Sequence, residues 1–203
     1  MVDVKAIACF PTLVHEFKLD LDHDKMIDYV YGMNLRTVAA GPEEDDLHKS
    51  LIFKPLVDEL TKIHELILQN LEYEYDKIEI TNMWANHLYK SHSHSPHTHS
   101  NNFLSGVYYL LGGFFEDTKT TTSPIQFFDP RPQTSILQPR RKNNNQHNSS
   151  MLAFASVSGT GLIFPSWLMH WVPSTEHERI SLSWNVMVHG HYGEPKTLQN
   201  AYM

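Results

Sequence analysis

The residues best suited to chemistry are histidines that stand just before an apolar, β-rich run. His97 and His99 lie two positions apart in the segment HSPHTHSNNFLSGVYYL, and His170 follows far downstream in GLIFPSWLMHWV. Alternate residues of an extended strand point to the same side, so two imidazoles at this spacing can reach one ion. Neutral imidazole binds iron, zinc, copper and nickel. The pattern indicates a metal site that combines two neighbouring histidines with a distant one.

This spacing alone leaves the ligands ambiguous. His92 and His94 stand in the same serine-rich stretch, so four histidines compete for two ligand positions. An exposed loop that is merely rich in histidine would explain the cluster equally well. Further evidence has to come from elsewhere in the chain.

A basic residue and a hydroxyl follow the distant histidine. Arg179 and Ser181 open the run RISLSWN, and their spacing places them on one face of a strand. The planar guanidinium of arginine binds a carboxylate through two parallel hydrogen bonds, and serine can add a third donor. A metal with a carboxylate clamp one strand away suits the chelation of a 2-oxo acid. Taken alone, Arg179 could equally form a surface ion pair with Glu176 or Glu178.

The elements that must position these residues change character along the chain. A strand is expected within residues 5–19, a short helix from Asp22 or Asp24, and a helix within 43–75, where apolar residues recur every three or four positions. After Tyr75, short apolar runs separated by Gly, Pro and Asn predict an antiparallel sandwich or barrel. The chain is therefore expected to be α+β, mainly β. The helical stripe is Leu56, Leu60, Ile63, Ile67 and Leu71, and the expected strand runs are KIEITNMWANHLYK, FLSGVYYLL, SPIQFFDP, TSILQP, MLAFASVSG, TGLIFPSWL and RISLSWNVMVHG.

Length and composition narrow the class of protein. The 203 residues suit a single domain, with residues 1–76 as N-terminal support, 77–190 as the β core and 191–203 as a tail. A net charge of −7 argues against nucleic-acid binding.

The single cysteine, Cys9, excludes an internal disulfide and is expected to be a buried thiol. The absence of a long apolar run predicts a cytoplasmic protein without a membrane partner. The polar segment 139–151 is expected to be a mobile loop or a lid.

Four segments together carry a family resemblance. PHTHSNNFLSGVYYL, FFDPR, GLIFPSWLMHWVPST and ERISLSWN, which lie within residues 83–188, resemble the iron(II)- and 2-oxoglutarate-dependent oxygenase superfamily. More narrowly, they are similar to an oxygenase family common in marine bacteria and their phages. The resemblance implies a double-stranded β-helix (jelly roll) with N-terminal flanking helices. It also implies Fe(II) as cofactor and 2-oxoglutarate as co-substrate.

The resemblance can be carried over residue by residue. It implies that His97 and His170 are metal ligands, that Arg179 and Ser181 hold the far carboxylate of 2-oxoglutarate, and that Tyr109 hydrogen-bonds a co-substrate carboxylate. The superfamily usually has Asp or Glu where this chain has His99. The narrower family carries the same His-x-His, which favours His99 as the third ligand and places His92 and His94 in the approach loop. No catalytic residue is expected beyond the ligands.

Two further groups of residues complete the expected site. Asp129 in FFDPR is the alternative third ligand, although the following Pro130 favours a turn-capping role. Half-buried packing is an equally good interpretation of Tyr109. Trp84 and Asn86 can line the pocket, with core packing favoured for Trp84. A dry wall around the metal is expected from Trp167, Trp171 and Trp184.

The implied function is that of a dioxygenase that hydroxylates an unidentified small-molecule or peptide substrate and releases succinate and CO2. Its other partner would be dioxygen, and the sequence leaves open whether the protein forms a homodimer. The first alternative is a cupin-like metal protein, an isomerase or a small-molecule binder, which would not need Arg179 or Ser181. The second alternative is a β-sandwich without catalytic activity whose histidines bind no metal.

Overall fold

Two antiparallel sheets form the body of the protein in a computed structural model that describes residues 2–33, 44–89, 91–116, 119–174 and 176–203. The five-stranded sheet has the order β1-β9-β4-β11-β2, and the four-stranded sheet has the order β3-β10-β7-β8. The strands of the large sheet are β1 (His15–Lys18), β2 (Lys77–Leu88), β4 (Leu104–Leu111), β9 (Thr160–Pro165) and β11 (Arg179–His189). Those of the small sheet are β3 (His94–His97), β7 (Ile125–Phe128), β8 (Met151–Phe154) and β10 (His170–Val172).

Short elements complete the described chain. Two hairpin ribbons are formed by β5 (Phe114–Phe115) with β6 (Thr120–Thr121) and by β12 (His191–Tyr192) with β13 (Ala201–Tyr202). The helices are α1 (Asp24–Gly32), α2 (Lys54–Asn70) and the 3-10 turns η1 (Leu47–Lys49) and η2 (Pro132–Ser135). Neither α1 nor α2 has the length and apolar character needed to cross a membrane.

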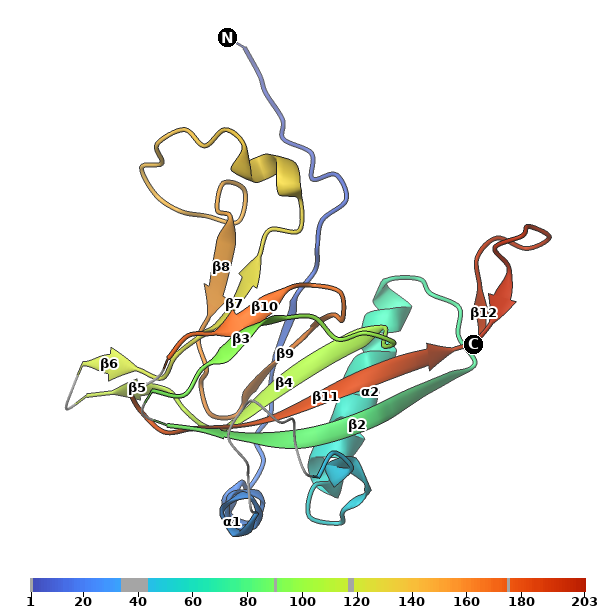
Figure 1. The fold of residues 1–203 in the computed structure, drawn as a ribbon. Helices are drawn as coiled ribbons and strands as arrows, with labels where there is room; N and C mark the ends of the chain where they lie inside the picture. Colours follow the sequence, from blue (N-terminus) through green and yellow to red (C-terminus); the bar gives the residue numbers. More distant parts are fainter. Residues whose placement is uncertain (1, 34–43, 90, 117–118, 175) are drawn as a thin grey trace.

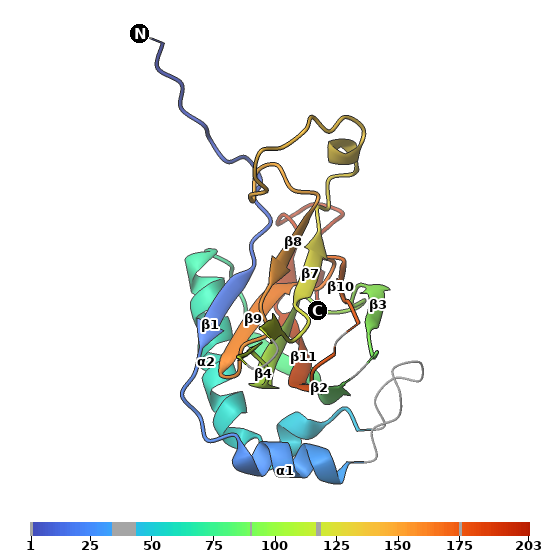
Figure 2. The ribbon, with the colours of Figure 1, turned by 90° about the vertical axis from the view of Figure 1, so that its left-hand side faces the viewer.

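The large sheet is covered on both faces. Helices α1 and α2 pack against one face, and the small sheet lies over the other (Figures 1 and 2). Strand β4 is consequently buried along nearly its whole length, which is why its sequence LSGVYYLL reads as an almost continuous apolar run rather than an alternating one. The predicted α+β, mainly β, arrangement with flanking helices is the one observed.

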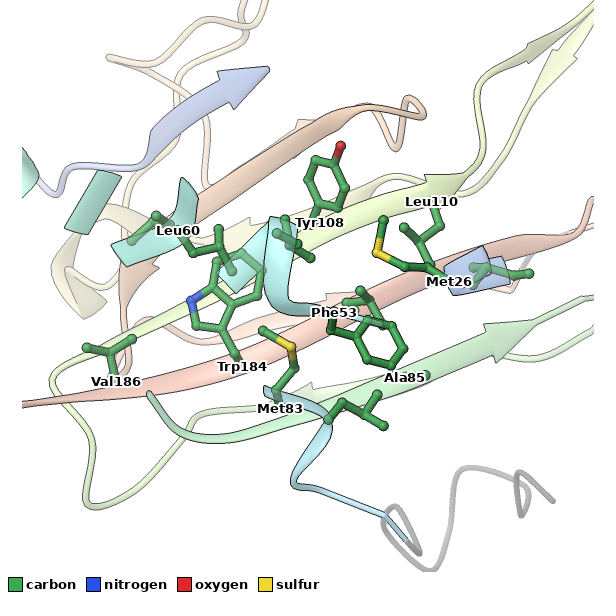
Figure 3. Close-up of a cluster of buried hydrophobic side chains, with 14 of the residues drawn as sticks. Met26, Phe53, Leu60, Met83, Ala85, Tyr108, Leu110, Trp184 and Val186 are labelled. Atoms are coloured by element: carbon green, nitrogen blue, oxygen red, sulfur yellow. The ribbon is translucent and has the colours of Figure 1, made fainter. Parts of the chain in front are cut away.

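The helix-facing core is built around Trp184. Its indole belongs to the same buried cluster as Leu60 of α2 and Met83 of β2 (Figure 3), and all three side chains are inaccessible to water. The indole fits because its partner across the β4–β11 ladder is Gly106, where a Cβ atom would stand only 2.1 Å from the ring. The indole N–H donates to His64 Nε2 at 3.2 Å. A close-packed apolar layer therefore fixes the back of the large sheet.

The expected elements are mostly found, with three differences. Helix α2 begins at Lys54, so the expected helical segment is shorter, and Glu43 lies outside the described residues. The expected strand within 5–19 is limited to His15–Lys18, and the exposed side chains before it include Cys9, which was expected to be buried. TSILQP forms the end of η2 and an exposed turn instead of a strand. Pro132 lies two residues before this segment and Pro139 ends it, and neither proline has the N–H group that a strand ladder would use.

Candidate metal centre and co-substrate site

The three predicted histidine ligands meet at one end of the small sheet. His97 is the last residue of β3 and His170 is the first residue of β10, and the two are paired across the antiparallel ladder. His99 lies just beyond β3, where its backbone N–H donates to the carbonyl of Ser166 at 2.9 Å. Strand pairing therefore brings together residues that are more than seventy positions apart in the sequence.

The spacing of the imidazole nitrogens suits a metal ion. One potential ligand atom from each of the three histidines lies within 4.8 Å of the others. The distance between His99 Nε2 and His170 Nε2 is 3.3 Å. Two nitrogens that each lie about 2.1 Å from a shared ion are separated by roughly 3 Å or slightly more, so this pair already has a coordinating separation.

Hydrogen bonds and burial prepare the ring nitrogens for binding. His170 Nδ1 is 2.9 Å from the Leu168 carbonyl, and His97 Nδ1 is 2.7 Å from the Ser95 carbonyl. An Nδ1–H that donates to a carbonyl fixes the tautomer and leaves the Nε2 lone pair for a metal. Burial, together with the neighbouring histidines, lowers the pKa of His99 to about 3 and that of His170 to about 4. Both rings are therefore neutral at neutral pH, as metal binding requires.

Arg179 lies inside the barrel rather than at the surface. It begins β11 and is only 1% exposed, and one guanidinium nitrogen, Nη1, donates to Ser181 Oγ at 3.1 Å. The guanidinium carbon lies 4.9 Å from the centre of the Tyr109 ring, which belongs to the neighbouring strand β4. Within the described part of the chain, no carboxylate pairs with Arg179. Glu178 instead contacts His87 and Tyr31, so the alternative of a surface ion pair is wrong for that residue.

Two buried donors at this position lack an acceptor. Among the described residues, no acceptor contacts Arg179 Nε or the Tyr109 hydroxyl, although both atoms are inaccessible to water. Burial raises the pKa of Tyr109, so its hydroxyl stays protonated and can donate. A buried cation and donor without an acceptor are costly unless a ligand supplies one. A dianionic 2-oxo acid would supply carboxylate oxygens to Arg179, Ser181 and Tyr109.

Asp129, the alternative third ligand, is occupied elsewhere. Its two carboxylate oxygens accept from Arg131 Nε at 3.0 Å and from Arg131 Nη2 at 2.9 Å. The Arg131 guanidinium holds the pKa of Asp129 down at about 2. The carboxylate also accepts from the backbone N–H of Arg131, which is the turn-capping role expected from the following proline.

One of the two histidines expected in the approach loop, His94, lies in a strand instead. His94 is the first residue of β3, and burial, followed by the charge of Arg179, lowers its pKa to about 4. It is therefore a half-buried strand residue, with its ring centre 6.5 Å from that of His97, rather than part of a solvated loop. His94 begins the four-residue strand HSPH, and the sequence of so short a segment did not indicate this placement.

A buried polar network was also missed. Ser105 Oγ bonds Ser166 Oγ at 2.8 Å and Asn185 Oδ1 at 2.7 Å, and Asn185 donates to Asn82 Oδ1 at 2.9 Å. Because the Ser166 carbonyl receives the His99 N–H, this network anchors the segment that carries the third histidine. The signal was present in SLSWN, where polar residues alternate with apolar ones along a buried strand.

The tryptophans are not arranged as a common wall. Trp184 faces the helices on the opposite side of the sheet, and Trp167 is 58% exposed. Trp171 is half-buried and donates its indole N–H to Gln126 Oε1 at 3.1 Å. Trp84, for which core packing was favoured, instead lies with its ring centre 5.8 Å from that of His99. Only Trp84 of the four directly adjoins a predicted ligand ring among the ring contacts of the described residues.

The fold and these side chains define a jelly-roll protein with a three-histidine cluster and a buried arginine clamp. Residues 82–185, about half of the chain, match the family model described as "Putative 2OG-Fe(II) oxygenase". The chain belongs to this 2OG-Fe(II) oxygenase family and is therefore an oxidoreductase that uses Fe(II) and 2-oxoglutarate. The matched residues run from β2 to β11 and include all three histidines, Tyr109, Arg179 and Ser181.

Solved structures share the fold at low sequence identity. A prolyl-4-hydroxylase from Pseudomonas putida superposes with a TM-score of 0.57 and 13% identity, over 91% of this chain and 88% of that one. A collagen prolyl hydroxylase from Paramecium Bursaria Chlorella virus-1, in complex with 2-oxoglutarate, superposes with a TM-score of 0.53 and 11% identity, over 85% of this chain and 94% of that one. HygX from Streptomyces hygroscopicus, with nickel and 2-oxoglutarate bound, superposes with a TM-score of 0.54 and 12% identity, over 87% of this chain and 83% of that one. No curated protein sequence gives a significant match.

Proposed function

We propose that His97, His99 and His170 hold Fe(II), that Arg179, Ser181 and Tyr109 hold the far carboxylate of 2-oxoglutarate, and that the enzyme hydroxylates its substrate with release of succinate and CO2. The observation that carries this proposal is the buried Arg179 guanidinium, which has no carboxylate partner in the described chain and stands beside the unpartnered Tyr109 hydroxyl. A cupin-like metal protein would have no use for such a clamp, so this observation separates the two candidate functions.

The donor set fits the metal. Three imidazoles form a compact group of nitrogen ligands of the kind that iron accepts, and three protein ligands leave positions open for co-substrate and dioxygen. Without a carboxylate ligand, the site would carry one more positive charge than a site with two histidines and a carboxylate. This extra charge favours the binding of a dianionic co-substrate. Bound Fe(II) would supply the redox chemistry that couples decarboxylation of the 2-oxo acid to oxidation of a C–H bond.

The protein's own residues have three tasks in this scheme. The Leu168 and Ser95 carbonyls hold the rings of His170 and His97 in the binding tautomer. Arg179 and Tyr109 orient the co-substrate from the closed end of the site, where both side chains are buried. Phe127 and Phe164 pack against the His170 ring, with ring centres 5.7 Å and 4.8 Å away, and exclude water from that side. Orientation and exclusion of water are the protein's contribution to cofactor chemistry.

The substrate is a small molecule or a peptide, and we expect the enzyme to act in the cytoplasm, in keeping with a single cysteine and no internal disulfide. The hydroxylases among the similar structures support hydroxylation as the type of reaction. Trp84, beside the His99 ring, is the residue best placed to contact the substrate.

Removal of the clamp tests the assignment. Arg179→Ala should weaken 2-oxoglutarate binding by about 2–5 kcal/mol, because the buried charge pair with the far carboxylate is lost. Isothermal titration of the metal-loaded variant measures this change, and the metal affinity of the same sample should stay unchanged. An unaltered co-substrate affinity would contradict the proposal and favour the cupin-like alternative.

A second pair of variants decides the third ligand. Loss of a residue that only orients a metal ligand lowers metal affinity by about 10–100-fold. His99→Ala removes a proposed ligand itself and should therefore lower metal affinity by at least this much. Asp129→Asn should leave metal affinity unchanged, because that carboxylate is committed to Arg131. The reverse outcome, a loss in the aspartate variant alone, would assign the third position to Asp129.

A further inference from the structure

The loop between β7 and β8, residues 129–150, forms a cavity whose lining contains none of the three clustered histidines and neither Arg179 nor Tyr109. Its volume is about 500 Å³, within the range of about 300–1,000 Å³ that is typical of small-molecule sites. The lining includes the cations Arg140, Arg141 and Lys142 and the polar side chains of Gln138 and Asn148. Most of these groups are hydrogen-bond donors, so the cavity favours a ligand rich in acceptors.

Positive charge is concentrated in this loop. Residues 129–150 contain four of the sixteen Lys and Arg residues but only one of the twenty-three Asp and Glu residues. The loop therefore carries +3 while the rest of the chain carries −10, within a total of −7. A cationic concavity on an acidic protein raises the local concentration of anions.

Three of the four cations are available to a ligand. Arg131 is neutralised by its bidentate pair with Asp129. Arg140, Arg141 and Lys142 are exposed, and no carboxylate of the described residues forms an ion pair with them. Arg141 Nη2 donates to Gln138 Oε1 at 3.2 Å, which aligns the guanidinium without neutralising it.

The loop that forms the cavity follows the end of β7 that is paired with His170. Phe127 of β7 is the strand partner of His170, and the backbone N–H of Phe128 donates to the Met169 carbonyl at 3.0 Å. Asp129, which lines the cavity, follows Phe127 by two residues, about 7 Å along an extended chain. The loop rises directly from the ends of β7 and β8 (Figure 1). A ligand anchored in the cavity can therefore extend toward the histidines.

The lining favours a compact anion over a polymer. Residues 129–150 contain no Phe, Tyr or Trp, so the loop offers no platform on which nucleic-acid bases could stack. The net −10 of the remaining chain would repel a long polyanion. Neighbouring guanidinium groups match the oxygen geometry of phosphate and carboxylate groups.

We propose that the cavity of the β7–β8 loop binds the phosphate or carboxylate group of an anionic substrate and holds the rest of that molecule toward the histidine cluster. This inference rests on the proposed function, since it names the substrate class of that site. Arg140, Arg141 and Lys142 supply the charge, and Leu137, whose side chain is 86% exposed and lines the cavity, supplies an apolar contact for the body of the ligand.

Anion titration of the full-length protein at constant ionic strength tests the proposal. Inorganic phosphate and the tricarboxylate tricarballylate are used as separate probes, and tighter binding of one of them identifies the anion. The triple variant R140A/R141A/K142A should lose about tenfold or more in affinity for the preferred probe, because charged hydrogen bonds are removed. The variant K49A/K54A/K62A removes equal charge from the helical side and should change affinity by no more than about twofold.

Two further measurements locate the binding. The preferred probe should still bind Arg179→Met, in which the other buried cation is gone, and 2-oxoglutarate affinity should be unchanged in the loop triple variant. Equal losses in both triple variants, or loss of the probe in Arg179→Met, would overturn the proposal. Binding of oligothymidylate or of phosphatidylserine vesicles with no binding of either small anion would also overturn it. If the unsubstituted protein binds 2-oxoglutarate but neither anion probe, only this inference is wrong. If it binds an anion probe but not 2-oxoglutarate, the proposed function is wrong.

Discussion

The two faces of the five-stranded sheet are built from the same strands but have different composition. On the helix-facing side, β11 presents Ile180, Leu182 and Trp184 to an apolar core that is closed to water. On the barrel side, the alternate residues Arg179 and Ser181 are polar and equally buried. Because side chains alternate along a strand, one strand can stabilise the fold with one face and bind a ligand with the other.

The two faces also differ in the kind of buried polar group that lacks a partner. On the helix side, the indole N–H of Trp184 has His64 Nε2 as its acceptor, and among the described residues it is the other ring nitrogen of His64, Nδ1, on an uncharged imidazole, that has none. On the barrel side, the groups without an acceptor among the described residues are Nε of the Arg179 cation and the Tyr109 hydroxyl. Unpartnered buried groups cost stability and are typical of sites that a ligand completes. The comparison therefore assigns stability to one face and binding to the other.

The largest effect on stability should come from the helix-facing side. Leu60→Ala removes a fully buried side chain beside Trp184 and should lower the free energy of unfolding by about 2–5 kcal/mol. Denaturant unfolding measures this loss, and 2-oxoglutarate affinity under native conditions should not change. Leu66→Ala on the same helix, where the side chain is 56% exposed, should stay within about 0.5 kcal/mol. A large loss of co-substrate affinity in L60A would show that the two faces are not independent.

The opposite response is expected on the barrel side. Arg179→Met replaces a buried unpaired charge with an apolar side chain of similar length, so the free energy of unfolding of the metal-free protein should rise by about 1–4 kcal/mol. Binding of 2-oxoglutarate should be lost in the same variant. Lys54→Met, at the exposed ion pair with Asp58, is the control and should change stability by about 1 kcal/mol or less. A destabilised R179M protein would mean that Arg179 serves the fold rather than the ligand.

A smaller effect concerns acid stability. Burial lowers the pKa of His64 to about 4. Between about pH 6.5 and pH 4, the unfolded chain therefore takes up a proton that the folded protein excludes. The stability present above about pH 6.5 is thus lost as the pH falls toward 4. His64→Gln keeps an acceptor for Trp184 and should make this decline shallower in thermal unfolding of the metal-free protein. His191→Gln, on the exposed β12–β13 ribbon, is the matched control, and an equal change in both would contradict the assignment.

Much of this comparison could be predicted from the sequence, since periodicity reports burial directly. The stripe that contains Leu56 and Leu60 predicted α2, and the spacing of Arg179 and Ser181 predicted their shared face, which the 3.1 Å bond between them confirms. Spatial convergence of His97, His99 and His170 was expected and is observed, while their role as ligands stays a prediction.

The features that were missed depend on which face of the sheet a residue occupies. Trp184 and Trp84 lie on strands that border the site, and only the pairing of β2 with β11 shows that Trp184 faces the helices while Trp84 faces His99. A one-residue change of register exchanges the two faces, and composition carries no information about it. The half-buried position of His94 likewise depends on its pairing with Val172, a residue that is distant in sequence.

The central claim, that the barrel face is an Fe(II) and 2-oxoglutarate site, is tested most directly by anaerobic reconstitution. Protein loaded with Fe(II) and titrated with 2-oxoglutarate should develop a weak visible charge-transfer band that saturates at one equivalent. His170→Ala, which removes a proposed ligand, should show no band at any co-substrate concentration. A wild-type protein that binds Fe(II) and 2-oxoglutarate without developing the band, or a His170→Ala variant that develops it in full, would contradict the account.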